Sequence, residues 1–326
     1  MTTWPMWIEY CTKLSDLTIA YNSFSTVPVN ALDNVANSLT RLNLYNNRLT
    51  HVPQAISVLT SLQVLTIQGN QITDLTWLPH NSTLDYLSLS NNYISNASHL
   101  SQALFPFNLS LHSLDTDHNL FTSLPDLSFL VNVQFFDFSH NKIQDSQTGN
   151  VNPDAFILNL SYNSLTSIPS LMSKLLSVSG FLLSYNNIKA MHETDFHSQV
   201  TSIDIGYNLI TELTNSSFPD NFGLLYLYLN NNPLNTISTV ALQRLPRLQN
   251  LNLQQTQLIR LPLALTYLTD IVLVDLTNCT ALVCTCDESG LSTWVMGFRP
   301  DFIPGSCGTT SVYEFFSVLS QYCPIH

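Results

Sequence analysis

Residues 158–165 read Leu-Asn-Leu-Ser-Tyr-Asn-Ser-Leu, and the same arrangement returns along the chain. It recurs as Leu-Asn-Leu-Tyr-Asn-Asn-Arg-Leu at 42–49, Leu-Ser-Leu-Ser-Asn-Asn-Tyr-Ile at 87–94 and Phe-Asp-Phe-Ser-His-Asn-Lys-Ile at 136–143. Each copy has apolar residues at its first, third and last positions and an asparagine two places before its end. A unit that returns every 20 to 50 residues or so is typical of a repeat architecture, so the repeat sets the fold.

The recurring asparagine gives the register of the array. Ten repeats carry it, and two further repeats place Thr256 and Cys279 in the same slot, which makes about twelve repeats spaced 22 to 27 residues apart. The ten asparagines are Asn22, Asn47, Asn70, Asn92, Asn119, Asn141, Asn163, Asn186, Asn208 and Asn232.

Side-chain alternation predicts the local structure of each repeat. In x-Leu-x-Leu-x a short strand turns its leucines into the core and exposes the residues between them. The chain then turns, and the asparagine amide can bond the backbone groups that the turn leaves unpaired. We therefore expect one parallel sheet and a buried ladder of asparagines. Thr256 and Cys279 also carry side-chain donors, so they can replace asparagine in the ladder.

The full pattern, L-x-x-L-x-L-x-x-N-x-L, resembles that of leucine-rich-repeat proteins. The resemblance implies an α/β solenoid, a horseshoe with a parallel concave β-sheet, over residues 14–281. Because no repeat buries its apolar faces alone, both ends of such an array need caps. We expect a shortened N-terminal cap at 1–13 and a cysteine-rich C-terminal cap at 282–326.

Four cysteines follow the last repeat, in a pattern that resembles the C-terminal cap of extracellular leucine-rich-repeat proteins. The resemblance implies disulfides between Cys284 and Cys307 and between Cys286 and Cys323, which persist only in oxidising compartments. The alternative is a zinc site of four thiolates. The C-x-C spacing disfavours it, because structural zinc sites separate such a pair more widely.

The other two cysteines, Cys11 and Cys279, fall near opposite ends of the array. Eleven repeat steps of about 4.8 Å separate them, whereas a disulfide needs Cα atoms within about 7 Å. We expect no bond between them in one chain, which leaves Cys11 without a partner.

Composition excludes several functions. Only 10% of the residues are charged, against about 25% in an average soluble protein, and 37 Ser, 31 Thr and 32 Asn supply polar surface instead. A net charge of -12 offers no basic footprint, so nucleic acid is not expected as a partner. The sequence lacks a phosphate-binding glycine loop, a dinucleotide fingerprint and a nucleophile elbow. We predict a protein that is not an enzyme and needs no cofactor.

The expected location is extracellular or at the cell surface, because of the cysteine-rich cap. The sequence has no apolar run of about 18 residues, the length that predicts a membrane-spanning helix, and no signal peptide is visible. A membrane segment outside this chain remains an alternative. Six N-x-[ST] sequons are about as many as chance gives, so they carry little weight. The candidate glycosylation sites are Asn81, Asn96, Asn108 and Asn215.

The exposed face of the sheet is the candidate binding surface, as is usual in arrays of this kind. In five consecutive repeats the residue before the ladder asparagine is His or Tyr, and tyrosine anchors interfaces well because it combines apolar area with a hydrogen-bonding tip. The candidate ligand-binding residues are Asp115, Asp117, His118, Asp137, His140, Tyr162, Tyr185, Asp204, Tyr207, Tyr226 and Tyr228. Two alternatives stay open: ordinary variation of the repeat, and a metal ion held by the Asp and His side chains between 115 and 140. We predict no metal site.

Between residues 49 and 243 there are 13 acidic side chains and three lysines. This excess of negative charge suits a partner with cationic or hydroxyl-rich groups. The alternative is that the acidic side chains only keep the protein soluble. We therefore predict a non-enzymatic module that binds a protein, peptide or glycan, either secreted or as the ectodomain of a membrane receptor. An intracellular scaffold of the same fold and an inhibitor of a secreted enzyme are the alternatives.

Overall fold

The structure is a computed structural model that describes residues 1–175 and 177–323. It divides into two compact units, unit 1 (Met1–Asn163) and unit 2 (Ser164–His326). The boundary falls inside the repeats, so each unit carries its own part of the array.

Unit 1, all of which is described, contains seven short parallel strands that pair in the order of the chain. Each strand has a buried Leu or Phe at its centre, and the register pairs centre with centre, as in Leu42 opposite Leu65. The strands are β1 (Asp16–Thr18), β2 (Arg41–Asn43), β3 (Val64–Thr66), β4 (Tyr86–Ser88), β5 (Ser113–Asp115), β6 (Phe135–Asp137) and β7 (Ile157–Asn159).

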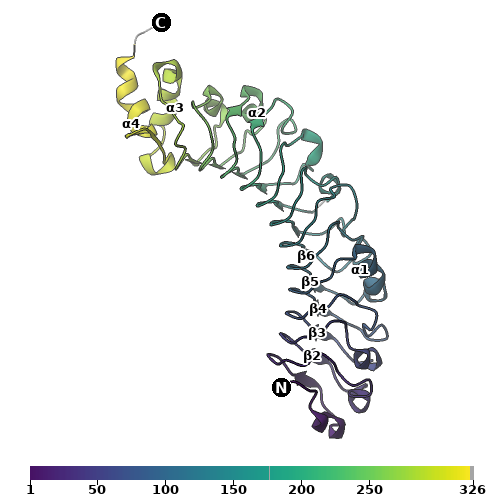
Figure 1. Ribbon diagram of the computed structural model, residues 1–326. Helices are drawn as coiled ribbons and strands as arrows, with labels where there is room; N and C mark the ends of the chain where they lie inside the picture. The colour runs from purple at the N-terminus through teal and green to yellow at the C-terminus, as the bar shows by residue number, and fades with distance from the viewer. Residues whose placement is uncertain (176, 324–326) are drawn as a thin grey trace. The chain divides into compact units, whose positions relative to one another are not determined.

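The return segments of unit 1 are short helices. Figure 1 shows β2 to β6 stacked along one side of the unit and α1 (Ala97–Leu104) on the opposite side. This helix fills the longest repeat, and Asn96 caps it by accepting a hydrogen bond from the His99 backbone N–H at 2.9 Å. The remaining helical segments are 3₁₀ turns at Met6–Tyr10, Asp33–Val35, Gln54–Val58 and Phe105–Phe107.

Unit 2 repeats this arrangement in its described residues. Its parallel strands are β8 (Gly180–Leu182), β9 (Ser202–Asp204), β11 (Tyr226–Tyr228), β13 (Asn250–Asn252) and β14 (Leu273–Asp275), each with a buried apolar residue at its centre. Two further strands, β10 (Glu212–Leu213) and β12 (Thr236–Ile237), form a small parallel pair. The return segments are α2 (Thr239–Gln243) and 3₁₀ turns at Met172–Lys174, Glu193–Asp195 and Leu263–Tyr267.

A ladder of asparagine side chains joins consecutive repeats. Asn92 is 2% exposed, and its Nδ2 donates to the carbonyl oxygen of Leu89 in its own repeat at 3.0 Å and to that of Ile67 in the preceding repeat at 3.1 Å. Its Oδ1 accepts a hydrogen bond from the Ile72 backbone N–H at 2.9 Å. Equivalent bonds to both repeats are made by Asn70, Asn119, Asn141, Asn163, Asn208 and Asn232.

The ends of the ladder use other partners. Asn22 follows the first strand, and its Oδ1 accepts a hydrogen bond from the N-terminal ammonium of Met1 at 2.6 Å. In the last two repeats, the Thr256 hydroxyl and the Cys279 thiol both donate to the carbonyl oxygen of Leu253, at 2.8 and 3.1 Å. A hydroxyl and a thiol therefore continue the ladder where asparagine is absent.

The chain after β14 forms a separate cap within unit 2. It contains α3 (Ser292–Met296), α4 (Val312–Ser317), the antiparallel pair β15 (Ser306–Cys307) and β16 (Thr310–Ser311), and 3₁₀ segments at Cys286–Leu291, Pro300–Phe302 and Leu319–Tyr322. Disulfides join Cys284 to Cys307 and Cys286 to Cys323, with Cα atoms 5.6 and 5.4 Å apart. All four thiols are thereby consumed, so the zinc alternative has no ligands. Cys11 and Cys279 are free thiols.

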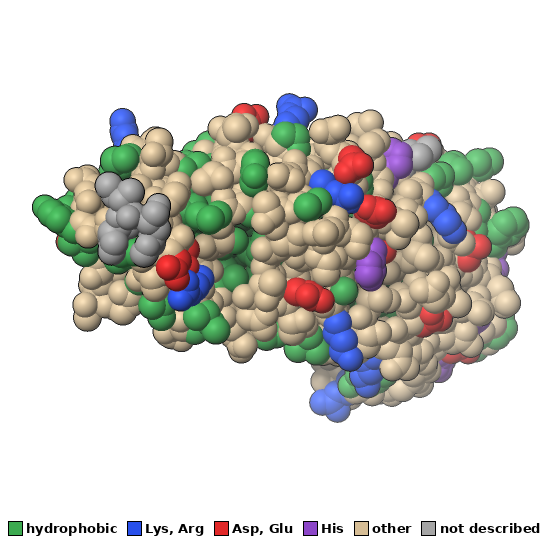
Figure 2. Space-filling model, turned by 90° about the horizontal axis from the view of Figure 1, so that it is seen from above, with side chains coloured by type: hydrophobic (Ala, Val, Ile, Leu, Met, Phe, Trp, Pro, Cys, Tyr) green, Lys and Arg blue, Asp and Glu red, His purple; other side chains and the backbone are tan. Residues whose placement is uncertain are grey.

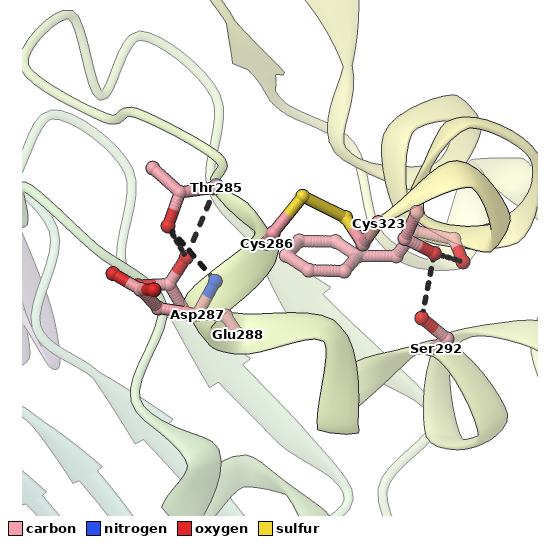
Figure 3. Close-up of a disulfide and its surroundings, with 8 residues drawn as sticks. Thr285, Cys286, Asp287, Glu288, Ser292 and Cys323 are labelled. Carbon is pink, nitrogen blue, oxygen red and sulfur yellow. Dashed lines mark hydrogen bonds between the residues drawn. A yellow bond between two sulfur atoms is a disulfide. The ribbon is translucent and has the colours of Figure 1, made fainter. Parts of the chain in front are cut away.

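Hydrogen bonds and ion pairs fasten the cap to the last repeats. Beside the Cys286–Cys323 bond, the Thr285 hydroxyl donates to the Glu288 carboxylate at 2.7 Å (Figure 3). The other oxygen of this buried carboxylate accepts a hydrogen bond from Arg260 at 3.0 Å, and the same guanidinium reaches Asp287 at 2.5 Å. The buried charge of Glu288 is thus paired, as a buried carboxylate requires.

The ladder yields the first prediction. We expect Asn92→Ala to lower the free energy of unfolding by about 1 to 3 kcal/mol, because it strands the buried Ile72 N–H, whereas the carbonyl oxygens of Ile67 and Leu89 keep their bonds to Asn70 and Asn119. Asn22→Ala, at the half-buried first rung, is the matched control and is expected to cost less. Denaturant unfolding measures both, and an unchanged midpoint for Asn92→Ala would contradict the role of the ladder.

Candidate binding face of the sheet

The residue before each ladder position adopts a left-handed backbone conformation. These twelve residues have φ between 52° and 68°, a region that residues other than glycine usually avoid. They are Tyr21, Asn46, Gly69, Asn91, His118, His140 and Tyr162 in unit 1, and Tyr185, Tyr207, Asn231, Gln255 and Asn278 in the described part of unit 2. The predicted aromatic column therefore stands in the turns that follow the strands, beside the open face, which we define as the sheet face carrying the first and last residue of each strand.

The ladder holds this turn in place. Besides its bonds to two repeats, Asn92 Nδ2 donates at 3.2 Å to the carbonyl oxygen of Ser90, the residue just before the left-handed Asn91. Asn119 does the same with Asp117, at 3.1 Å, just before His118. The side chain that stabilises the array thus also fixes the direction in which each turn residue points.

In unit 1 three rings of the column lie face to face. The centroids of His118 and His140 are 4.0 Å apart with 10° between their planes, and those of His140 and Tyr162 are 4.1 Å apart at 12°. Adjacent strands lie about 4.8 Å apart, which brings equivalent turn residues within stacking distance. His118 is also held by Asp117, whose Oδ2 lies 2.7 Å from its Nδ1, and the Ser90 hydroxyl donates to the other oxygen of Asp117.

Protonation of His140, the middle ring of the stack, is disfavoured. Burial lowers the pKa of His140 below its ordinary value, and the neighbouring His118 lowers it further by charge repulsion. The folded chain therefore favours the neutral form of His140. Because the unfolded chain binds this proton more readily, the contribution of His140 to stability is lost as the pH falls below the ordinary histidine pKa.

The predicted aspartates of unit 1 take part in hydrogen bonds within the sheet. The Tyr86 hydroxyl donates to Asp115 at 2.6 Å, and burial together with this carboxylate raises the pKa of Tyr86 to about 12. Asp137 accepts hydrogen bonds from the Ser139 backbone N–H at 2.8 Å and from Asn159 Nδ2 at 3.2 Å. Among the described residues, no group of three or more His, Cys, Asp or Glu side chains is placed to hold a metal ion.

Unit 2 has its own pair of stacked rings and tyrosines. The centroids of Tyr185 and Tyr207 are 4.0 Å apart with 10° between the planes, and these side chains are 37% and 41% exposed. Burial raises the pKa of the Asp204 carboxyl and that of Tyr228, the neighbouring residue on β11. Tyr226, at the first position of β11, is exposed.

A hollow of about 430 Å³ opens in unit 2, where the cap meets the first residues of β11, β13 and β14. We call it the cap hollow. Its lining includes Tyr226, which was predicted, and residues that sequence reasoning missed: Gln249, Asn250, Val272, Leu273, Asp301 and Phe302. The strand residues follow no pattern that distinguishes them, and nothing in the repeat predicts where residues 301 and 302 of the cap fold back.

Comparison with known proteins agrees with this architecture. A family model described as leucine rich repeat matches residues 12–72 and 198–258. Lumican of Gallus gallus is 32% identical over 208 residues, which span 61% of this chain and 50% of lumican. The leucine-rich repeat-containing G-protein coupled receptor 5 of Rattus norvegicus is 30% identical over 186 residues, 55% of this chain and 20% of the receptor. The match thus spans about half or less of these relatives' lengths.

A solved structure shows the same fold. In an octameric complex of latrophilin 3, Unc5D and FLRT2 (LRR), one chain aligns with a TM-score of 0.72 and 19% identity, covering 96% of this chain and 95% of that chain. The chain therefore has the fold of a leucine-rich-repeat array, closed by a disulfide-bonded C-terminal cap. It resembles lumican and the receptor among the members of this class.

The histidine stack yields the second prediction. We expect His140 to titrate below the ordinary histidine pKa, and His118→Asn to raise the pKa of His140, because the repelling charge and part of the covering ring are removed. NMR titration of the imidazole protons measures both values. His112→Asn changes a histidine that pairs with Asp85 outside the stack and serves as the control. An unshifted His140 in His118→Asn would show that the two rings do not interact in solution.

Proposed function

We propose that this chain is a non-enzymatic binding module that takes a protein, peptide or glycan ligand on its open face. In this proposal, residues 14–281 present the binding surface and residues 1–13 and 282–326 close its ends. The observation that carries the proposal is the set of stacked rings found in each unit, of which Tyr162 in unit 1 and Tyr185 and Tyr207 in unit 2 are 37% to 42% exposed.

The stacked rings suit binding because they are already ordered. A side chain that is free before binding loses about 0.5 to 1.5 kcal/mol when an interface immobilises it. The ladder and the neighbouring rings hold His140 and Tyr162 in place, which reduces this loss. Exposed aromatic rings in fixed positions are typical anchors of protein interfaces.

The surface carries few charged side chains, and this determines which kind of ligand would complement it. Figure 2 shows one face of the molecule on which Lys, Arg, Asp and Glu are scattered among uncharged side chains and backbone. With a net charge of -12 over the whole chain, a ligand rich in hydroxyl or cationic groups is the natural complement.

We further propose that the full-length protein is secreted or displayed at a cell surface. Two disulfides in the cap support this location, because such bonds persist in oxidising compartments. The candidate glycosylation sites Asn81, Asn96 and Asn215 are exposed, and Asn108 is half-buried. No helix in the described residues has the length and apolarity needed to cross a membrane.

The open face is tested by the double variant Tyr162→Ala with Tyr185→Ala. Ligands are first found by screening the chain against a panel of secreted proteins, cell-surface ectodomains and glycans. We expect the double variant to lose at least about tenfold in affinity for a ligand so found, since such anchors contribute more than about 1.4 kcal/mol. Tyr93→Ala with Tyr267→Ala removes two exposed tyrosines that lie outside the strands and outside the left-handed turn positions, and is the control. Equal binding by the first double variant would place the site elsewhere.

The location is tested on protein from its natural source. Non-reducing peptide mapping by mass spectrometry reads the cysteine linkages and the sequons together. We expect Cys284 linked to Cys307, Cys286 linked to Cys323, and glycans on the exposed sequons. Free thiols with unmodified asparagines would support the intracellular scaffold instead.

A further inference from the structure

The cap hollow contains a hydrogen-bond acceptor without a partner. Asn250 lines it at the first position of β13, and its Oδ1 is buried with no hydrogen-bond partner in the described chain. An acceptor left unpaired in this way costs free energy that a donor from a ligand can recover. The final torsion of an asparagine side chain is soft, so the amide can reorient when a donor enters the hollow.

The walls of the cap hollow are apolar and partly aromatic. Val272 is 51% exposed, and the rings of Tyr226 and Phe302 are 38% and 37% exposed. Exposed apolar side chains that line a concave site favour a ligand group with apolar area of its own. A volume of about 430 Å³ exceeds what one side chain fills, so part of the adjoining main chain also fits.

The charge of the cap hollow is negative. Asp301 is the charged side chain among its described lining residues, and it is exposed. Residues 164–326 contain six Lys and Arg against eleven Asp and Glu, so the surroundings also favour a cation. The ligand that fits must combine an apolar stem, a flat group that packs on rings, several donors and a positive charge.

We propose that the cap hollow binds an arginine side chain presented by an extended segment of a partner protein. The inference rests on the proposed binding function and names the chemistry of the partner. The methylene stem packs on Val272 and Leu273, and the guanidinium lies against the aromatic rings. Its donors reach Asn250 Oδ1 and the Asp301 carboxylate.

Other occupants fit less well. An apolar side chain fills the same space but leaves Asn250 unpaired and removes water from Asp301 without a counter-charge. A carboxylate is repelled by Asp301. Lysine carries the charge, but its compact ammonium is strongly hydrated and cannot stack on Tyr226 and Phe302 as a planar group does.

The test compares two peptides that differ only in charge and donors. Acetyl-Ala-Arg-Ala-amide and the same peptide with citrulline in place of arginine are titrated into the protein, and methyl NMR signals of Val272 and Leu273 report binding. We expect the arginine peptide to bind about tenfold more tightly, the effect of one charge-assisted hydrogen bond. Equal binding of both peptides, or shifts confined to other methyl groups, would overturn the proposal.

Variants assign the preference to the cap hollow. Asp301→Asn should bring the ratio of the two peptide affinities close to one. Asn250→Leu should lower the affinity for the arginine peptide. Asn250→Asp, which keeps an acceptor, should restore or raise that affinity. Asp270→Asn changes an exposed acid that does not line the hollow and is the control. A preference that survives in both Asp301→Asn and Asn250→Leu would refute the site.

The arginine site in the cap hollow and the proposed function of the open face can fail independently of each other. If the arginine peptide binds as expected but the double variant Tyr162→Ala with Tyr185→Ala binds a macromolecular ligand as tightly as the unchanged chain, the cap hollow stands and the open face fails. If a ligand binds through Tyr162 and Tyr185 while the two peptides bind equally, only the cap hollow is wrong.

Discussion

In most repeats one amide side chain spans two turns of the chain and bonds the backbone of both. Asn92 shows the full pattern, with donors to its own and the preceding repeat and an acceptor for the Ile72 N–H. The same amide bonds the carbonyl just before a left-handed residue, a conformation that costs about 1 to 2 kcal/mol for most side chains. The ladder therefore does two things at once: it aligns the strands, and it keeps each turn in a conformation that presents its side chain.

Much of this architecture could be predicted from the sequence, because the repeat supplies many independent copies of the same information. The leucines at the strand centres, the slots of Thr256 and Cys279 and the position of the cap all follow from spacing. The left-handed turn could not be predicted so directly, since tyrosine and histidine at that slot look like ordinary strand residues. Their stacking depends on a φ value that the pattern of apolar residues does not encode.

The candidate site was less predictable where it depends on contacts between segments that do not repeat. Tyr86 was not among the predicted residues, although its hydroxyl on β4 donates a hydrogen bond to the predicted Asp115 on the adjacent strand β5. Asn250 and Phe302 come from a strand and from the cap, and only folding brings them to one hollow. The spacing of the repeats predicts where each residue lies in the sheet. The cap occurs once in the chain, so no second copy of it exists from which its contacts could be inferred.

Because each ladder bond reaches only the neighbouring repeat, the array has a natural unit of length. Removing or duplicating a segment from one ladder asparagine to the next rejoins two compatible edges, so the new neighbours meet the same donors and acceptors. Removing a segment that is not a whole number of repeats leaves strand centres opposite exposed positions and an amide facing the wrong carbonyls. Natural variants of this chain should therefore differ in size by whole repeats of 22 to 27 residues, and the distance between the stacked rings and the cap can change in evolution without a change in either.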